Sequence, residues 1–84
     1  MASKVLLPSK VAKDIILNMK LTLNGEERII SGVTTLTDLV KKLDLTNKPI
    51  AVELNLNVVP KARLDATLLS DGDKVEIVQF VGGG

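Results

Sequence analysis

Alternation of apolar and polar residues predicts that the folded part of the chain opens with a β-hairpin. Residues 19–24 alternate strictly, as a strand with one buried face does. The dipeptide Asn24-Gly25 follows, a strong signal for a tight two-residue hairpin turn. Residues 27–31 supply a returning strand, so we expect strands 19–24 and 27–31 to pair antiparallel.

A helix signature comes next. Thr35 and Asp38 have the spacing of a capping box, in which the Thr hydroxyl accepts a backbone N–H and the acidic side chain reaches back toward the N-cap. Apolar residues then recur at helical spacing on one stripe: Leu36, Leu39, Val40 and Leu43. The pattern predicts a helix of about two turns that is buried along one side.

Two more strands follow the breaker Asn47-Lys48-Pro49. Residues 50–55 alternate again, and the short apolar pair Val58-Val59 ends at Pro60. Because proline has no N–H to donate to a sheet, a strand that ends in proline is expected at an edge. The pattern predicts a strand at 50–55 and a short edge strand at 58–59.

An irregular connection precedes the last strand. Leu64, Leu68 and Leu69 are interpreted as core residues of this connection. Asp71-Gly72-Asp73 then predicts a turn. The further oxygen ligands of a calcium loop are missing around these two aspartates, so we expect no metal site.

The final strand, predicted at 74–81, is apolar on both faces, with Val75 and Ile77 on one and Val78 and Phe80 on the other. Apolar residues on both sides indicate a central position in the sheet. The helical crossover places this strand beside the first strand and parallel to it. One main helix packed across one face of a mixed sheet predicts an α+β, β-grasp-like fold.

Composition narrows the chemistry available to the chain. Its 84 residues, 9.0 kDa, form one domain, and they include no Cys, His, Trp or Tyr. Thiolate nucleophiles, imidazole bases, zinc clusters and disulfides are therefore excluded. No phosphate-binding loop or dinucleotide fingerprint is present, so any ATP-dependent step requires a separate protein.

Charge and hydropathy argue against nucleic-acid and membrane partners. Eleven basic and ten acidic residues leave a formal charge of +1, and the basic residues are scattered. Phe80 is the only aromatic residue, which leaves no stacking platform for bases. No run approaches the roughly 18 apolar residues of a membrane span. The apolar clusters within residues 1–18 are too short for a secretory signal, so we expect a cytoplasmic protein.

The candidate functional group is the C-terminal carboxylate. Val81-Gly82-Gly83-Gly84 follows the last strand without a linker, and glycine has no Cβ, so this slender tail fits a channel too narrow for other residues. Composition of the tail alone is equally typical of a frayed terminus. The strand that leads directly into it favours a flexible tail, residues 82–84, that projects from the domain.

Residues 19–84 resemble the ThiS family, the sulfur carrier proteins of thiamin biosynthesis in the ubiquitin-like β-grasp superfamily. The resemblance rests on Asn24-Gly25-Glu26, on Ala51-Val52-Glu53-Leu54-Asn55 with Val58-Val59-Pro60, and above all on Asp71-Gly72-Asp73-Lys74-Val75-Glu76-Ile77-Val78 with the terminal glycines. Residues 1–18 fall outside the family pattern. We interpret them as an N-terminal extension to a β-grasp domain at 19–81.

The resemblance implies a carrier that is not itself an enzyme. Its C-terminal Gly84 is adenylated by a ThiF-like adenylyltransferase that uses ATP and is converted to a thiocarboxylate, with sulfur from a donor such as a cysteine desulfurase persulfide. The sulfur then passes to a ThiG-like thiazole synthase. Gly83 and Gly84 fall on the diglycine of the family, Gly82 extends the tail, and the chain binds no cofactor itself.

The folded domain must also bind the partner enzyme when the tail enters its active site, because three glycines offer few contacts. The sheet face not covered by the helix is the natural surface, and Val78, Phe80 and Ala51 are its candidate apolar patch. Ordinary burial in the strands is the alternative for these three side chains.

Three other functions stay open. The small subunit of molybdopterin synthase has the same fold and chemistry with another acceptor, although the compact final strand and triple glycine favour the thiamin branch. A protein modifier would use Gly84 to form isopeptide bonds with lysines. A β-grasp interaction module would not need Gly84 at all.

Overall fold

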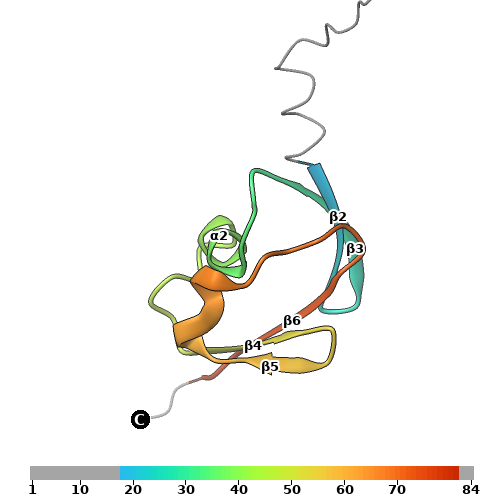
Figure 1. Cartoon of the computed structure of the whole chain (residues 1–84). Coiled ribbons are helices and arrows are strands. Elements are labelled where there is room, and N and C mark those ends of the chain that lie inside the picture. The colour runs from blue at the N-terminus through green and yellow to red at the C-terminus, as the bar shows by residue number, and fades with distance from the viewer. Residues whose placement is uncertain (1–17, 82–84) are drawn as a thin grey trace, which may run out of the picture.

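Five strands and one α-helix dominate residues 18–81, the part of the chain that the computed structural model describes (Figure 1). The elements are β2 (Asn18–Leu23), β3 (Glu26–Ser31), α2 (Leu36–Lys42), β4 (Ile50–Leu54), β5 (Asn57–Val59), the 3-10 helix η1 (Lys61–Ala66) and β6 (Lys74–Gln79). They form one mixed sheet of order β3-β2-β6-β4-β5. The expected N-terminal extension, apart from Asn18, and the expected tail at 82–84 lie outside the described residues.

The opening hairpin is confirmed. β2 and β3 pair antiparallel, with Leu21 opposite Arg28 and Leu23 opposite Glu26, so each strand lies within one residue of its predicted place. Asn24 and Gly25 form the turn with φ of 50° and 85°. Two successive positive φ angles match the twist of the flanking strands, which is why this dipeptide forms the turn.

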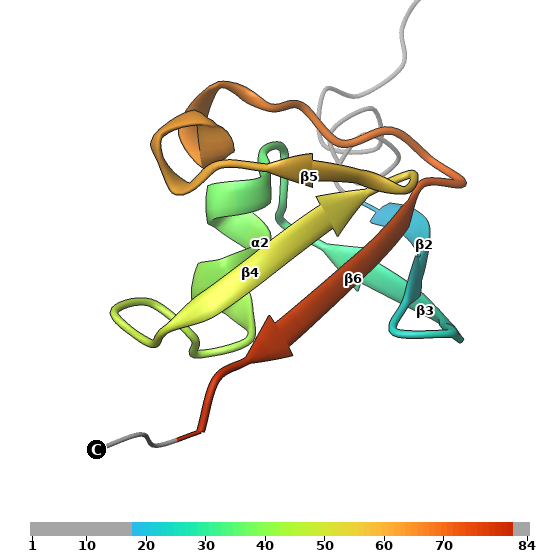
Figure 2. The same cartoon turned by 90° about the horizontal axis from the view of Figure 1, so that it is seen from below.

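The central position of β6 is confirmed, but only one of its faces is buried. β6 pairs parallel with β2 and antiparallel with β4, where Val52 lies opposite Ile77. Val75 and Ile77 are buried, whereas Val78 and Phe80 are 55% and 57% exposed. No element of residues 18–81 covers the second face, so its apolar residues are not buried within the domain (Figure 2).

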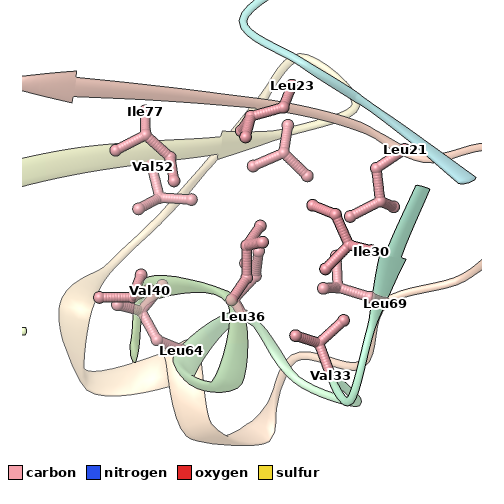
Figure 3. Close-up of a cluster of buried hydrophobic side chains, with 12 residues drawn as sticks. Leu21, Leu23, Ile30, Val33, Leu36, Val40, Val52, Leu64, Leu69 and Ile77 are labelled. Atoms are coloured by element: carbon pink, nitrogen blue, oxygen red, sulfur yellow. The ribbon is translucent and has the colours of Figure 1, made fainter. Parts of the chain in front are cut away.

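Helix α2 has the predicted cap and the predicted buried stripe. The Thr35 hydroxyl accepts the Asp38 N–H, and the Asp38 carboxylate accepts the Thr35 N–H, which completes the capping box. Leu36 and Leu39 are fully buried, and Val40 nearly so. They pack against the inward residues of β2, β4 and β6 in one hydrophobic core on the helix side of the sheet (Figure 3).

The connection after β5 corrects one prediction. Leu64, in η1, and Leu69 are buried, as expected, but Leu68 is 66% exposed and is not a core residue. The reason is local: Leu68 forms an isolated antiparallel bridge with Thr35, and the Leu69 N–H donates to the Thr34 carbonyl. In such extended backbone adjacent side chains point to opposite sides, so only one of the two leucines reaches the core.

Candidate functional site

The end of β6 fixes the point after which the C-terminal glycines follow, here called the exit. Gln79 pairs with Ile50 at the start of β4, and the Phe80 N–H donates to the Pro49 carbonyl at 2.8 Å. Val81 is 91% exposed. The sheet pairing therefore ends at Phe80, and Val81 makes little contact with the sheet. The three glycines proposed as the functional tail lie beyond the described residues.

The structure places the predicted docking residues around this exit. Val78 lies directly opposite Ala51 in the pairing of β6 with β4, so both side chains are on the open face of the sheet. Phe80, two residues further along, follows the same alternation. Val78 and Phe80 are more than half exposed and Ala51 is half-buried. We call Ala51, Val78 and Phe80 the tail-side patch.

Two carboxylates adjoin this patch, and sequence reasoning missed their proximity. Glu53 lies opposite Glu76 in the same strand pair, one step along the open face from Ala51 and Val78. Like charges that face each other across strands are unfavourable. The alternation of each strand places both residues on the open face, but their pairing depends on a register that a single sequence does not reveal. They give the tail-side patch an acidic border.

Asn24 is a second residue whose role the sequence pattern did not reveal. Its side-chain Oδ1 accepts the Ile77 N–H at 2.7 Å, and its Nδ2 donates to the Ile77 carbonyl at 3.2 Å. The amide thus continues the pairing of β2 with β6 past the end of β2. This contact holds the strand that leads to the tail against the first hairpin.

The two aspartates of the predicted turn serve structural hydrogen bonds. Asp71 accepts the Lys20 N–H at 2.7 Å. Asp73 accepts the Ser70 N–H at 2.7 Å and the Asn55 amide at 3.0 Å. The turn is confirmed, and it fastens the start of β6 to two neighbouring segments. Across residues 18–81 there is no group of three or more potential metal-ligating side chains.

The Asp38 carboxylate at the start of helix α2 has a shifted pKa. The backbone N–H of Thr35, then that of Thr34, hydrogen-bond the Asp38 carboxylate and lower its pKa below the usual value for an aspartate. Asp38 caps α2 and does not border the tail-side patch.

Within the part of the chain that the structure describes, no helix is long and apolar enough to cross a membrane.

Comparison with known proteins decides the family. The sequence model of the ThiS family matches residues 21–84, which include the strand exit and the terminal glycines. The chain belongs to the ThiS family. The resemblance inferred from the final strand and its glycines is thereby confirmed.

Individual relatives agree with this family membership. The sulfur carrier protein ThiS of Bacillus subtilis is 40% identical over 65 residues, which are 76% of this chain and 98% of that protein. The crystal structure of the thiamine biosynthesis protein ThiS from Geobacter metallireducens superimposes with a TM-score of 0.67 at 38% identity, over 79% of this chain and all of that one. The chain is thus a β-grasp member of a sulfur carrier family of thiamin biosynthesis, and the predicted fold class is confirmed.

A longer relative has a different name. A thiazole synthase of Paramagnetospirillum magneticum is 47% identical to this chain over 66 residues, which are 79% of this chain. The chain spans only 20% of that protein. A ThiS-like segment therefore occurs there within a much longer polypeptide named as a thiazole synthase.

Proposed function

We propose that this ThiS-family chain carries sulfur as a thiocarboxylate on Gly84, for formation of the thiazole of thiamin. The observation that carries the proposal is the match of the ThiS family model, which extends through Gly84. The glycines follow Val81, which comes after β6 and is 91% exposed. The same match favours the thiamin branch over the molybdopterin branch. In this proposal the chain is a substrate of its partners and performs no catalysis of its own.

The chemistry requires activation, because a carboxylate delocalises its charge and is a poor electrophile. A Gly84 carboxylate oxygen attacks the α-phosphorus of ATP on a ThiF-like adenylyltransferase, and pyrophosphate leaves. The terminal sulfur of a persulfide, supplied by a cysteine desulfurase, then attacks the acyl carbon and AMP leaves. A thiol reduces the resulting acyl disulfide to the thiocarboxylate. This chain holds neither ATP nor a cofactor in the scheme, and it has no cysteine to attack its own activated terminus.

Entry of the tail into a partner needs additional binding energy. Fixing the backbone costs roughly 1–2 kcal/mol per residue, so ordering Gly82, Gly83 and Gly84 costs on the order of 3–6 kcal/mol. Glycines return few contacts. We propose that burial of the tail-side patch against the partner offsets this ordering cost. Because the patch lies beside the exit, its binding also holds the tail at the partner's active site.

The proposed acceptor of the sulfur is a ThiG-like thiazole synthase. Support comes from the relative in which a ThiS-like segment is part of a chain named thiazole synthase. Covalent linkage raises the effective concentration of two domains for each other, so a fusion of this kind supports direct contact between a ThiS-like domain and a thiazole synthase. Nucleic acid and membranes have no part in the proposal.

Mass spectrometry tests the proposed function. The full chain is incubated with ATP, the adenylyltransferase of the same genome and a persulfide donor, and we expect one oxygen of Gly84 to be replaced by sulfur. A chain extended by one phenylalanine after Gly84 is the matched control; it should escape adenylation with an unchanged melting temperature. An unmodified Gly84, under conditions that modify a known ThiS protein, would refute the proposal.

A further inference from the structure

A hollow opens on the helix side of the sheet, close to the exit of the tail. It has a volume of about 250 Å³. It lies between α2, β4, β5, η1 and the segment that joins α2 to β4. We call it the helix-side hollow. Its floor is apolar: Val40, Ile50, Val52, Val59 and Leu64. Lys48 and Lys61 stand at its rim.

The helix-side hollow and the tail-side patch share strand β4. Ile50 and Val52 line the hollow, whereas Ala51 between them belongs to the patch on the opposite face. The described chain ends on the same side, because the Phe80 N–H donates to the carbonyl of Pro49, next to Lys48 in the sequence. Figure 1 shows the α2–β4 segment and η1 on the side of the molecule where β6 ends, and Figure 2 shows the α2–β4 segment there as well.

The rim of the hollow is positively charged. Lys48 and Lys61 are exposed. The ion pair within residues 18–81 joins Lys20 to Glu27 on the other face, so neither rim lysine is neutralised by a described residue. Asp65 also borders the hollow; its carboxylate accepts a hydrogen bond from the Thr37 hydroxyl, which does not cancel its formal negative charge, so the two lysines and Asp65 together leave a formal charge of +1. An apolar floor beneath two ammonium groups is complementary to an apolar side chain flanked by carboxylates.

We propose that the helix-side hollow is a second docking site, which receives an apolar side chain of thiazole synthase with acidic neighbours. The proposal rests on the function proposed above, in which the synthase accepts the tail. The volume favours a protein side chain over a free metabolite, because small-molecule pockets usually measure about 300–1,000 Å³. A partner at the exit that contacts both faces of β4 would hold the tail in a single direction.

Calorimetry of the unmodified chain with the thiazole synthase of the same genome tests the proposal without any sulfur chemistry. Lys48→Glu/Lys61→Glu should raise the Kd about tenfold, since two favourable charge contacts become repulsive. Val59→Phe keeps a strand-forming residue and fills the hollow, and it should raise the Kd by a similar factor. The effect of the charge reversal should shrink in high salt, whereas that of Val59→Phe should persist.

The matched control is Arg28→Glu/Lys42→Glu, which changes the net charge equally. Arg28 lies on the far edge strand β3, and the Lys42 ammonium lies beside Gly32. This variant should bind like the wild type, and melting temperatures should show that all variants fold. Wild-type affinity in both hollow variants overturns the proposal, and so does a loss of affinity for the adenylyltransferase alone. Failure of the proposed function is seen separately, as an unmodified Gly84 in the wild-type chain.

Discussion

The turn between β4 and β5 contains the clearest conflict between a residue and its conformation. Asn55 and Leu56 have φ of 50° and 73°, nearly the geometry of Asn24 and Gly25 in the first hairpin. Asparagine tolerates this region, but a leucine there brings its Cβ close to the backbone. Leu56 is 85% exposed, so it recovers little from burial. The second hairpin therefore has the right first turn residue and a strained second one.

Leu56→Gly should consequently stabilise the domain by about 1 kcal/mol, because relief of roughly 1–2 kcal/mol of strain exceeds the extra chain entropy of glycine. The reciprocal change Gly25→Leu should destabilise it by a similar amount. No atom lies within 4 Å of a Cβ added at Gly25, so conformation alone determines that result. Urea unfolding measures both. A loss of stability in Leu56→Gly would show that the leucine makes contacts beyond its exposed position.

Residue-level prediction from sequence succeeded where the backbone determines the residue and failed where distant strands meet. Asn24-Gly25 and the Thr35 cap are local signals and were read correctly. The contact of the Asn24 amide with Ile77 joins residues 53 positions apart. The pairing of Glu53 with Glu76 likewise depends on strand register. The order of residue types in a single sequence does not show which residues of distant strands lie side by side.

At the scale of elements, the cap of α2 predicts how stability responds to pH. The Asp38 pKa is lowered by the N–H groups of Thr35 and Thr34. Its unfolded value is about 3.9. A lowered folded pKa means that the stabilisation is fully present above the unfolded pKa and is lost as the pH falls through the folded pKa. We therefore expect Asp38→Asn to be less stable than the wild type at pH 7, with the difference narrowing below about pH 4.

Urea unfolding between pH 7 and pH 2.5 checks this expectation. Asp44→Asn is the matched control, because Asp44 follows the helix at φ of 64°, where asparagine is well tolerated. It should not reproduce the loss at pH 7. A difference between Asp38→Asn and the wild type that stays constant down to pH 2.5 would mean that the charge of the carboxylate does not stabilise the cap.

Most elements were predictable because each has a local periodicity. The first hairpin, β4 and α2 follow from alternation or from the 3.6-residue repeat. The central place of β6 was inferred from apolar residues on both of its faces, although only one face is buried, and its parallel pairing with β2 was inferred from the crossover. Leu68 was assigned to the core because composition alone does not set the direction of a side chain in irregular backbone. The helix-side hollow was not predicted either, since it arises where five separate segments leave space between them.

At the scale of the whole molecule, one end of β4 and β6 gathers the features that the proposed function needs. The exit of the tail, the tail-side patch and the helix-side hollow all lie there, while the edge strand β3 is at the far side of the sheet. Ile29 on β3 is 69% exposed on the same open face, opposite Lys20. If the adenylyltransferase needs only an apolar sheet face, substitutions of Ile29 and Val78 should weaken its binding equally. If it needs apolar surface beside the exit, only substitution of Val78 should weaken binding.

Arginine at each position separates these cases. Val78→Arg should raise the KM of adenylation at Gly84 about tenfold or more, because burial of a valine side chain is worth about 1.5–3 kcal/mol and the charge must also be desolvated. Ile29→Arg adds the same charge and should leave the KM unchanged. Both positions are exposed, so neither change should shift the melting temperature by more than a few degrees. Equal KM values for the two variants would show that the adenylyltransferase does not bind the tail-side patch.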